Sequence, residues 1–249
     1  MHSVLCTLGG INVYSYGLMI DIGVICAYIL MLRRRHIYKI PANCILDIVI
    51  ILTAAGMIGA RLLYVALYHD EFHSLKDLFS VWNGGLSFHG GLLLGLLCVW
   101  LYCKYRRLRF LTALDMLSPA LCVAYAYGRI GCFLNGCCYG KFSDSFIACP
   151  MLTHEGLRTC IPTQLISSAC GFGICCILIA LQKYFTREGQ QLSCFLALFG
   201  LYRFVVEFFR YYPSDAYLGA LTQGQYISLV MIAAGITAGV LLNKKGKPQ

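Results

Sequence analysis

Charged residues are scarce in this sequence of 249 residues. Asp, Glu, Lys and Arg make up 12% of the chain and only 11 residues are acidic, whereas hydrophobic residues make up 59%. Because soluble globular domains carry about 25% charged residues, this balance excludes that class. The net charge is +9, but the basic residues occur in short clusters between apolar runs. Since this pattern is typical of membrane topology, we expect an integral membrane protein with no nucleic acid partner.

Two further features are absent. The first ten residues contain no basic segment, and the first apolar run ends at three consecutive arginines, Arg33 to Arg35, instead of a small-residue cleavage site. We therefore expect no cleaved signal peptide. The sequence also shows no internal repeat and no inverted pair of interrupted hydrophobic segments, which argues against a secondary transporter.

Seven apolar runs use most of the chain, because one crossing of the bilayer core takes about 20 residues. They cover approximately residues 13–32, 45–67, 89–103, 111–129, 163–181, 192–209 and 225–242. Clusters of Lys and Arg follow the first, third, fifth and seventh runs. The positive-inside rule then places the N-terminus outside and the C-terminus in the cytoplasm. The predicted fold is all-α and polytopic, with about seven transmembrane helices in a single transmembrane domain over residues 1–249.

Four arginines lie within these apolar runs: Arg61, Arg129, Arg203 and Arg210. A charge at the centre of a bilayer costs about 3 kcal/mol or more, so such residues indicate a functional site. The sixth run also contains Glu207, and a helix would present Arg203, Glu207 and Arg210 on one face. A buried structural ion pair is one interpretation. Because one carboxylate cannot neutralise two guanidinium groups, the surplus positive charge favours an anionic ligand.

Arg129 is the arginine best suited to bind phosphate. The nearby Gly128 and Gly131 permit close approach of a ligand to the backbone, and a guanidinium group matches phosphate oxygens in a forked geometry. The alternative is that Arg129 extends to the membrane interface, and the same alternative stays open for Arg61.

His89 and Tyr16 are candidates for the same site. A histidine at the start of the third run titrates near neutral pH, so it would act as a general base or orient a substrate, or else serve only in packing. Tyr16 would add a phenol, or belong to an interfacial aromatic belt. The predicted topology places Arg61, His89 and Arg129 toward the outer ends of their runs, so the polar centre would face the outer leaflet.

The chain has 15 cysteines, most of them in apolar runs where a thiol behaves as a small hydrophobic group. Cys132, Cys137 and Cys138 instead lie in a polar stretch after the fourth run. Their spacing does not match a zinc motif, because no second pair of ligands follows. Arg129 would lower the pKa of a catalytic thiol at Cys132. Small interior residues or an external disulfide are the simpler interpretations.

In their order along the chain, these residues resemble the motifs of prolipoprotein diacylglyceryl transferase, a bacterial family of seven-span enzymes that lipidate lipoproteins. The similar motifs are Tyr16-Gly17, Gly59-Ala60-Arg61, Gly84 to Gly91 with His89, Gly128-Arg129-Ile130-Gly131, Asn135-Gly136, Tyr139-Gly140, Pro162-Thr163-Gln164, Arg203 with Glu207 and Arg210, and Gly224-Gln225. Each motif alone is weak evidence, whereas the ordered combination is specific.

The resemblance implies transfer of a diacylglyceryl group from phosphatidylglycerol to the lipobox cysteine thiol of a prolipoprotein, with release of glycerol phosphate. The enzyme would lie in the cytoplasmic membrane with its site facing the outer leaflet, and would need no metal and no cofactor. The catalytic residues implied are His89, Arg129 and Arg203. The substrate-binding residues implied are Tyr16, Arg61, Asn135, Gly140, Glu207 and Arg210.

The sequence departs from the family pattern at two positions. The family's usual signature reads Gly-Arg-x-Gly-Asn-Phe-x-Asn-Gly-Glu, and here Cys132 replaces the first Asn and Cys137 replaces the Glu. An amide and a carboxylate have become thiols, which form only weak hydrogen bonds. Two other hypotheses therefore stay open: a paralogue that binds or moves an anionic lipid without this transfer, and a protein whose cysteines are redox-active.

Overall fold

The computed structural model describes residues 4–8, 11–69, 85–153, 156–212 and 217–244. Gly84, at the start of one of the motifs above, lies outside the described residues. The chain forms two compact units: residues 1–31 together with 114–249 make the first, and residues 32–113 make the second. The single domain over residues 1–249 stays a prediction, and each unit is described by itself.

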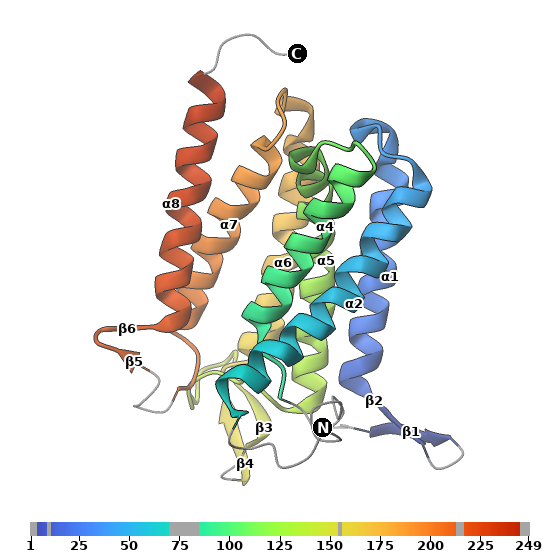
Figure 1. The fold of residues 1–249 in the computed structure, drawn as a ribbon. Coiled ribbons are helices and arrows are strands. Elements are labelled where there is room, and N and C mark those ends of the chain that lie inside the picture. The colour runs from blue at the N-terminus through green and yellow to red at the C-terminus, as the bar shows by residue number, and fades with distance from the viewer. Residues whose placement is uncertain (1–3, 9–10, 70–84, 154–155, 213–216, 245–249) are drawn as a thin grey trace. The chain divides into compact units, whose positions relative to one another are not determined.

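The described part of the chain is mostly helical (Figure 1). Its helices are α1 (Ser15–Tyr38), α2 (Ala42–Leu67), α4 (Phe88–Tyr105), α5 (Phe110–Asn135), α6 (Thr163–Leu181), α7 (Gln190–Glu207) and α8 (Gln223–Lys244), with the short 3-10 helix η3 (Gln182–Tyr184) after α6. Most of each predicted apolar run lies in one of these helices, which agrees with a helical, polytopic membrane protein.

Six helical segments in the described residues are long and apolar enough to cross a membrane: α1, α2, α4, α5, α6 with η3, and α8. The remaining helix, α7, has 18 residues but begins with two glutamines and carries Arg203 and Glu207 near its other end. These polar residues lower its hydropathy. The seventh span and the orientation of the termini therefore stay predictions.

The ends of several helices differ from the predicted runs. The first run was expected to begin at residue 13, but Ile11–Tyr14 forms a strand and α1 continues through the arginines at 33–35 to Tyr38. The helix α5 continues six residues beyond Arg129, to Asn135. Backbone hydrogen bonding does not stop where the side chains become polar, so hydropathy alone locates the apolar run and not the helix end.

In the described part of the chain, the loops contain three short antiparallel hairpins, which the sequence pattern did not predict. They pair β1 (Val4–Leu8) with β2 (Ile11–Tyr14), β3 (Cys149–Thr153) with β4 (Gly156–Cys160), and β5 (Tyr217–Leu218) with β6 (Leu221–Thr222). In the hairpin of β3 and β4, Cys149 lies opposite Cys160. Met151, two residues after Cys149 in β3, is fully buried. This hairpin is therefore a packed element of the first unit.

In the first unit, the core lies where α5, α6 and α7 meet. Cys122 of α5 packs with Ile174 and Leu178 of α6 and with Phe195 of α7. The helices α7 and α8 lie side by side (Figure 1). Their approach is close at Gly235, where an added Cβ would lie 2.6 Å from the backbone nitrogen of Ala197. Small residues at such contacts let membrane helices pack through their backbones.

In the second unit, α2 and α4 are in contact through glycines. A Cβ on Gly59 would collide with the carbonyl oxygen of Gly90, and a Cβ on Gly91 would lie 2.7 Å from the carbonyl oxygen of Gly56. Ser87 donates its backbone N–H to the carbonyl of Ala60 at 2.9 Å. The glycine pair that follows His89 in the sequence is therefore needed for helix packing in this unit.

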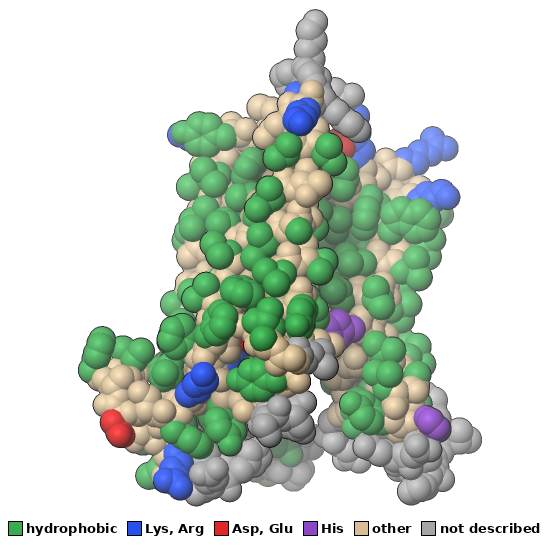
Figure 2. All heavy atoms as spheres, turned by 90° about the vertical axis from the view of Figure 1, so that its left-hand side faces the viewer, with side chains coloured by type: hydrophobic (Ala, Val, Ile, Leu, Met, Phe, Trp, Pro, Cys, Tyr) green, Lys and Arg blue, Asp and Glu red, His purple; other side chains and the backbone are tan. Residues whose placement is uncertain are grey.

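The outward surface of the helices is apolar. On the face drawn in Figure 2, hydrophobic side chains cover the middle of the helices and charged side chains lie toward the ends. On α8, for example, Val230 is 67% exposed and Ile236 is 57% exposed. Hydrophobic side chains exposed in this way along a spanning helix are suited to contact with lipid chains.

A buried carboxylate holds the start of α7 against α5. Asp115 of α5 is 5% exposed. Its two oxygens accept hydrogen bonds from the backbone N–H groups of Gly189, at 2.6 Å, and Leu192, at 2.7 Å. These groups belong to the first turn of α7, where backbone donors have no partner within the helix. Asp115 thus acts as an N-cap supplied by another helix.

We expect Asp115→Ala to destabilise the folded protein, because it leaves two backbone N–H groups without their acceptor at a cost of about 1–3 kcal/mol each. Thermal unfolding of the purified protein in detergent micelles measures this effect. Asp144→Ala, at an exposed loop position, is the matched control and should unfold at the wild-type temperature. Equal unfolding temperatures for both variants would contradict the capping role.

Candidate active site

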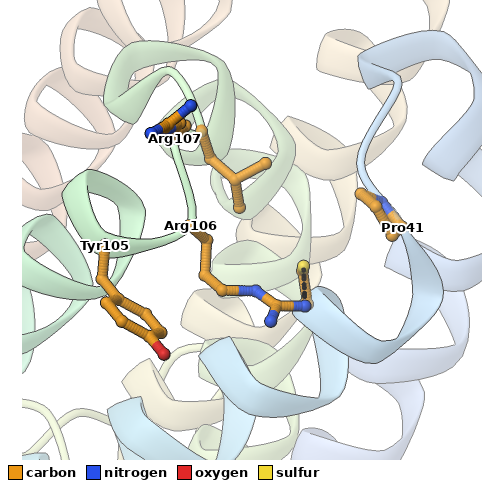
Figure 3. A pocket seen from close by; sticks show the side chains of 6 residues that line it. Pro41, Tyr105, Arg106 and Arg107 are labelled. Atoms are coloured by element: carbon orange, nitrogen blue, oxygen red, sulfur yellow. Dashed lines mark hydrogen bonds between the residues drawn. The ribbon is translucent and has the colours of Figure 1, made fainter.

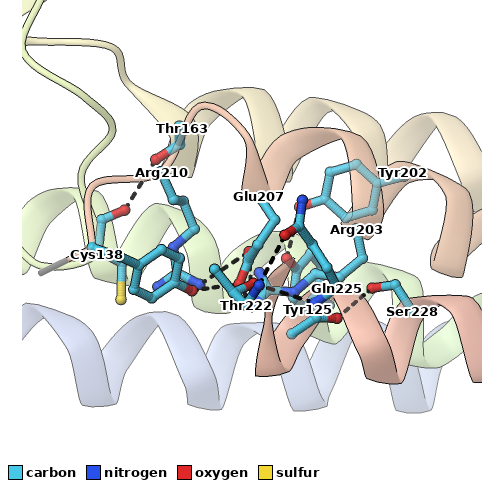
Figure 4. Close-up of polar contacts among 12 residues, drawn as sticks. Tyr125, Cys138, Thr163, Tyr202, Arg203, Glu207, Arg210, Thr222, Gln225 and Ser228 are labelled. Carbon is cyan, nitrogen blue, oxygen red and sulfur yellow. Dashed lines mark hydrogen bonds and ion pairs between the residues drawn. The ribbon is translucent and has the colours of Figure 1, made fainter. Parts of the chain in front are cut away.

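The centre of the candidate site is the carboxylate of Glu207, at the last residue of α7. Its side chain is 1% exposed, and Oε2 lies 3.4 Å from Nη2 of Arg203 and 3.6 Å from Nη1 of Arg210. Figure 4 shows the carboxylate between the two guanidinium groups. The grouping of these three residues is confirmed. They do not share one helix, however, because α7 ends at Glu207 and Arg210 follows in the next segment.

The position of Arg210 depends on the loop after α5. Gly140 and Arg210 form an isolated antiparallel bridge, and Lys141 donates its backbone N–H to the carbonyl of Phe209 at 2.8 Å. A Cβ on Gly140 would lie 2.6 Å from the carbonyl oxygen of Ile161 and 2.7 Å from that of Phe209. Only glycine fits between these backbones, so Gly140 contributes to the site by letting the loop hold Arg210.

Two residues outside the predicted set complete the surroundings of Glu207. The hydroxyl of Tyr212 donates a hydrogen bond to Oε1 of Glu207. Burial and this hydrogen bond raise the pKa of Tyr212 to about 12, so the phenol stays a donor at neutral pH. A Cβ on Gly224 would collide with Oε1 of Glu207 and lie 3.1 Å from its carboxyl carbon. Gly224 therefore leaves room for the carboxylate.

The cluster carries a surplus of positive charge. One carboxylate faces two guanidinium groups, and Nη1 of Arg203 is buried without a hydrogen-bond partner among the described residues. Buried donors in native proteins are nearly always paired, so an unpaired guanidinium nitrogen marks a place where a ligand or an ordered water is expected. A phosphate oxygen is the acceptor that matches this group best.

Arg129 is linked to this cluster by a pair of tyrosines. Its guanidinium carbon lies 4.9 Å from the centre of the Tyr125 ring, one helical turn earlier in α5. The hydroxyl of Tyr125 is 2.7 Å from that of Tyr202, the residue before Arg203. The cation–π contact and the hydrogen bond thus connect Arg129 of α5 with the residue that precedes Arg203 in α7.

The loop that follows Arg129 is held by the start of α6. The side chain of Thr163 donates to the carbonyl of Cys138 at 3.0 Å, and Nε2 of Gln164 donates to the carbonyl of Cys137 at 2.7 Å. Both side chains are buried. Asn135, the last residue of α5, is exposed at the start of this loop. The motif at residues 162–164, which had no assigned role, thus positions the loop.

The three cysteines of this loop come together although their spacing did not predict a cluster. The Sγ atoms of Cys132, Cys137 and Cys138 all lie within 4.8 Å of one another. Hydrogen bonds from the other two thiols, with the positive charges of Arg210 and Arg129, hold the pKa of the Cys138 thiol below its usual range. The positive charges of Arg129 and Arg210 therefore both act on the thiol of Cys138.

Tyr16 lies in the same unit, on the first turn of α1, and is 41% exposed. A Cβ on Gly131 would lie 3.2 Å from Cδ2 of its ring. The glycine after Arg129 therefore allows α1 to pack against α5 at this point. Tyr16 therefore lies near Gly131, and its role in the site stays a prediction.

Arg61 and His89 belong to the second unit. Arg61 is 8% exposed, and its Nη1 donates to the carbonyl of Gly85 at 2.9 Å. Gly85 has a φ of 73°, and an added Cβ there would lie 2.7 Å from the same nitrogen. His89 is exposed in the first turn of α4, with its ring 5.9 Å from that of Phe88. Their membership of one site with Arg129 stays a prediction.

A pocket in the second unit has a volume of about 430 Å³ and contains none of the predicted site residues. Its lining residues are Pro41, Cys44, Tyr105, Arg106, Arg107 and Leu108. Figure 3 shows Arg106 donating a hydrogen bond to Sγ of Cys44, at 3.4 Å. Arg106 and Arg107 belong to the basic cluster after the third apolar run, so this pocket shares no residue with the candidate site.

The sequence pattern missed Tyr125 and Tyr202, because tyrosines in apolar runs are typical of packing. It missed Tyr212 because this residue follows the end of the sixth run. Gly224 and Gln164 belonged to family-like motifs but carried no chemistry by themselves. A polar residue at the start of an apolar run, such as Thr163 or Gln225, was the available signal. In α8, Oε1 of Gln225 accepts the backbone N–H of Thr222 at 3.0 Å, which caps the helix.

Comparison with known proteins identifies the family. The model of the family described as prolipoprotein diacylglyceryl transferase matches residues 3–241. A protein of Clostridium tetani named phosphatidylglycerol–prolipoprotein diacylglyceryl transferase is 33% identical, over 95% of this chain and 96% of its own length. Proteins of the same name from Finegoldia magna, 31% identical over 98% and 97%, and Clostridioides difficile, 32% identical over 99% and 98%, are also similar. The chain belongs to the prolipoprotein diacylglyceryl transferase family.

Proposed function

We propose that this protein transfers the diacylglyceryl group of phosphatidylglycerol to the cysteine thiol of a prolipoprotein lipobox. The observation that carries the proposal is the buried cluster at the end of α7, where Arg203 and Arg210 outnumber the single carboxylate of Glu207 and one nitrogen of Arg203 lacks a partner. This arrangement suits the phosphate of an anionic lipid headgroup. The names of the similar proteins describe the same substrates.

The reaction forms a thioether. The sulfur of the substrate cysteine attacks the glycerol carbon that carries the phosphate, a carbon–sulfur bond forms, and the carbon–oxygen bond to phosphate breaks. Glycerol phosphate leaves with the electron pair of that bond and gains negative charge as it departs. Arg129 and Arg203 stabilise this charge, since preorganised donors act most strongly where charge develops in the transition state.

The remaining predicted residues are assigned to proton transfer and substrate binding. His89 accepts the proton of the attacking thiol or orients the headgroup. Glu207 fixes the positions of the two arginines beside it, and Gly140 holds the backbone of Arg210. Contact with the headgroup and the glycerol is assigned to Tyr16, Arg61, Asn135 and Arg210.

We also propose the finer topology. Seven spans place the N-terminus outside, the C-terminus in the cytoplasm and the site toward the outer leaflet, within one transmembrane domain. The support is the distribution of Lys and Arg, which follow alternate apolar runs. In this topology α7 crosses the membrane with its polar end packed inside the protein, where Glu207 is buried.

The topology predicts that a reporter active only in the cytoplasm will function when fused after residue 244. The same reporter fused into the loop at residue 146, where Phe146 is 99% exposed, should be inactive. A reporter active only outside the cytoplasm should give the reverse result. The opposite pattern would overturn the orientation without affecting the assignment of the site.

Arg203→Ala should lower the rate of diacylglyceryl transfer by about 100-fold or more, as expected for loss of a group that stabilises the transition state. Arg203→Lys should recover little, because an ammonium group cannot replace the forked guanidinium contact. The assay uses purified protein in micelles with phosphatidylglycerol and a lipobox peptide, and detects one diacylglyceryl mass on the peptide. Lys183→Ala, at an exposed position after α6, is the control. Lipid binding without any peptide product in the wild type would support the non-catalytic alternative instead.

Gly224→Ala tests the packing around Glu207 with a single methyl group. The added Cβ has no room beside the carboxylate, so Glu207 and the arginines must shift, and we expect transfer to fall by about tenfold or more. Gly173→Ala is the matched control on α6, where an added Cβ has nothing within 4 Å. Equal activities of these two variants would show that the position of Glu207 is unimportant for transfer.

A further inference from the structure

The three thiols after Arg129 have the geometry of a metal site. The Sγ atoms of Cys132, Cys137 and Cys138 lie within 4.8 Å of one another. Sulfur atoms bound to one tetrahedral zinc ion at ~2.3 Å are ~3.8 Å apart. Small side-chain rotations would therefore bring all three sulfurs to one ion.

The backbone of this cluster is already arranged and held. Gly136 and Cys138 have φ values of 76° and 61°, so the chain reverses immediately after α5 and brings the second and third thiols back to the first. Cys137 donates its backbone N–H to the carbonyl of Cys132 at 3.1 Å. The buried side chains of Thr163 and Gln164 bind the carbonyls of Cys138 and Cys137 (Figure 4 shows the first of these bonds). Binding an ion would thus require little ordering of the ligands.

The charges around the cluster favour an anionic complex. Three thiolates and one divalent cation carry a net charge of −1. Arg129 precedes Cys132 by about one turn of α5, and Arg210 is bridged to Gly140, which follows Cys138 closely in the chain. Positive charge placed near the cluster attracts a complex of net negative charge. The same arginines that suit a lipid phosphate therefore also suit a metal–thiolate group.

The number of ligands distinguishes between two kinds of site. Among the described His, Cys, Asp and Glu residues, the group contains these three cysteines and no fourth member. Structural zinc sites have four protein ligands, whereas catalytic sites have three and leave one position open. We propose that Cys132, Cys137 and Cys138 bind one soft divalent cation of the zinc class and leave a fourth position for an incoming thiol.

The identity of the incoming thiol rests on the proposed function. The lipobox cysteine would bind as the fourth ligand and release its proton to solvent. Its sulfur then attacks the glycerol carbon, the carbon–sulfur bond forms, and glycerol phosphate departs with the electrons of the broken carbon–oxygen bond. Cys132 and Cys137 replace the amide and carboxylate of the family signature, so this chain would prepare its nucleophile differently from relatives that keep them.

Cobalt binding tests the metal site directly, because thiolate-bound tetrahedral Co²⁺ absorbs visible light. The full-length protein in micelles, reduced and freed of metal, should give a saturable spectrum at one Co²⁺ per chain, and Zn²⁺ should displace the Co²⁺. Cys132→Ser, Cys137→Ser and Cys138→Ser should each weaken binding by about 100-fold or more, beyond the loss typical of outer-shell changes. Cys176→Ser, at an exposed position of α6, should bind as the wild type does.

Two measurements guard against misfolded variants. Cys137→His replaces the sulfur ligand with a nitrogen ligand and should retain binding with a shifted spectrum. Each variant without metal should unfold at the temperature of the metal-free wild type. Absence of a stoichiometric cobalt spectrum would overturn the proposal. Unchanged binding in the serine variants, or a disulfide among the three cysteines in the isolated protein with no bound metal, would also overturn it.

The open position is tested with a peptide. A lipobox peptide should change the spectrum of the cobalt-loaded protein, whereas the same peptide with serine in place of cysteine should not. A spectrum unaffected by the cysteine peptide would overturn the fourth-ligand assignment. The transfer assay separates this proposal from the proposed function. Transfer that persists without metal rejects only the fourth-ligand role of the substrate thiol, and metal binding without transfer rejects only the transferase activity.

Discussion

The ion cluster of Arg203, Glu207 and Arg210 is the constraint on which the site in the first unit depends. A buried carboxylate is costly unless it is paired, and here two guanidinium groups and the hydroxyl of Tyr212 surround it. Because two guanidinium groups face one carboxylate, positive charge remains in excess. The same contacts that make the burial of Glu207 tolerable therefore leave a place for an anionic ligand. Structure and binding capacity have one physical origin here.

The elements around this cluster are arranged to hold it in place. The α5 helix reaches it through Arg129 and the hydrogen-bonded pair of Tyr125 and Tyr202. The loop after α5 reaches it through the bridge between Gly140 and Arg210. The start of α8 contributes Gly224, which leaves space for the carboxylate. Residues far apart in the sequence thus meet because each satisfies a charge, a hydrogen bond or a steric limit set by the others.

Much of the fold and part of the site could be predicted from the sequence. Long apolar runs predicted the helices, because a bilayer core permits few other ways to satisfy backbone hydrogen bonds. The arginines inside those runs predicted a functional cluster, and the contacts of Arg203, Glu207 and Arg210 agree. The hairpins were missed, since strands of two to five residues produce too short a pattern. The role of Gln164 was missed because its partner, the carbonyl of Cys137, is distant in the sequence. Tyr212 is close to Glu207 in the sequence but lies beyond the end of α7, where helical periodicity no longer predicts contacts.

The cysteines show the difference between what the sequence determines and what the tertiary structure decides. By itself, the sequence determined the helical membrane class, the family motifs and the presence of thiols where the family signature has an amide and a carboxylate, because composition and local order suffice for these. Only the tertiary structure decided that Cys132, Cys137 and Cys138 converge. It also decided that Gly140 and Gly224 are required by close contacts. Such outcomes depend on left-handed backbone turns and on neighbouring helices, and distances between side chains follow from packing and not from spacing along the chain.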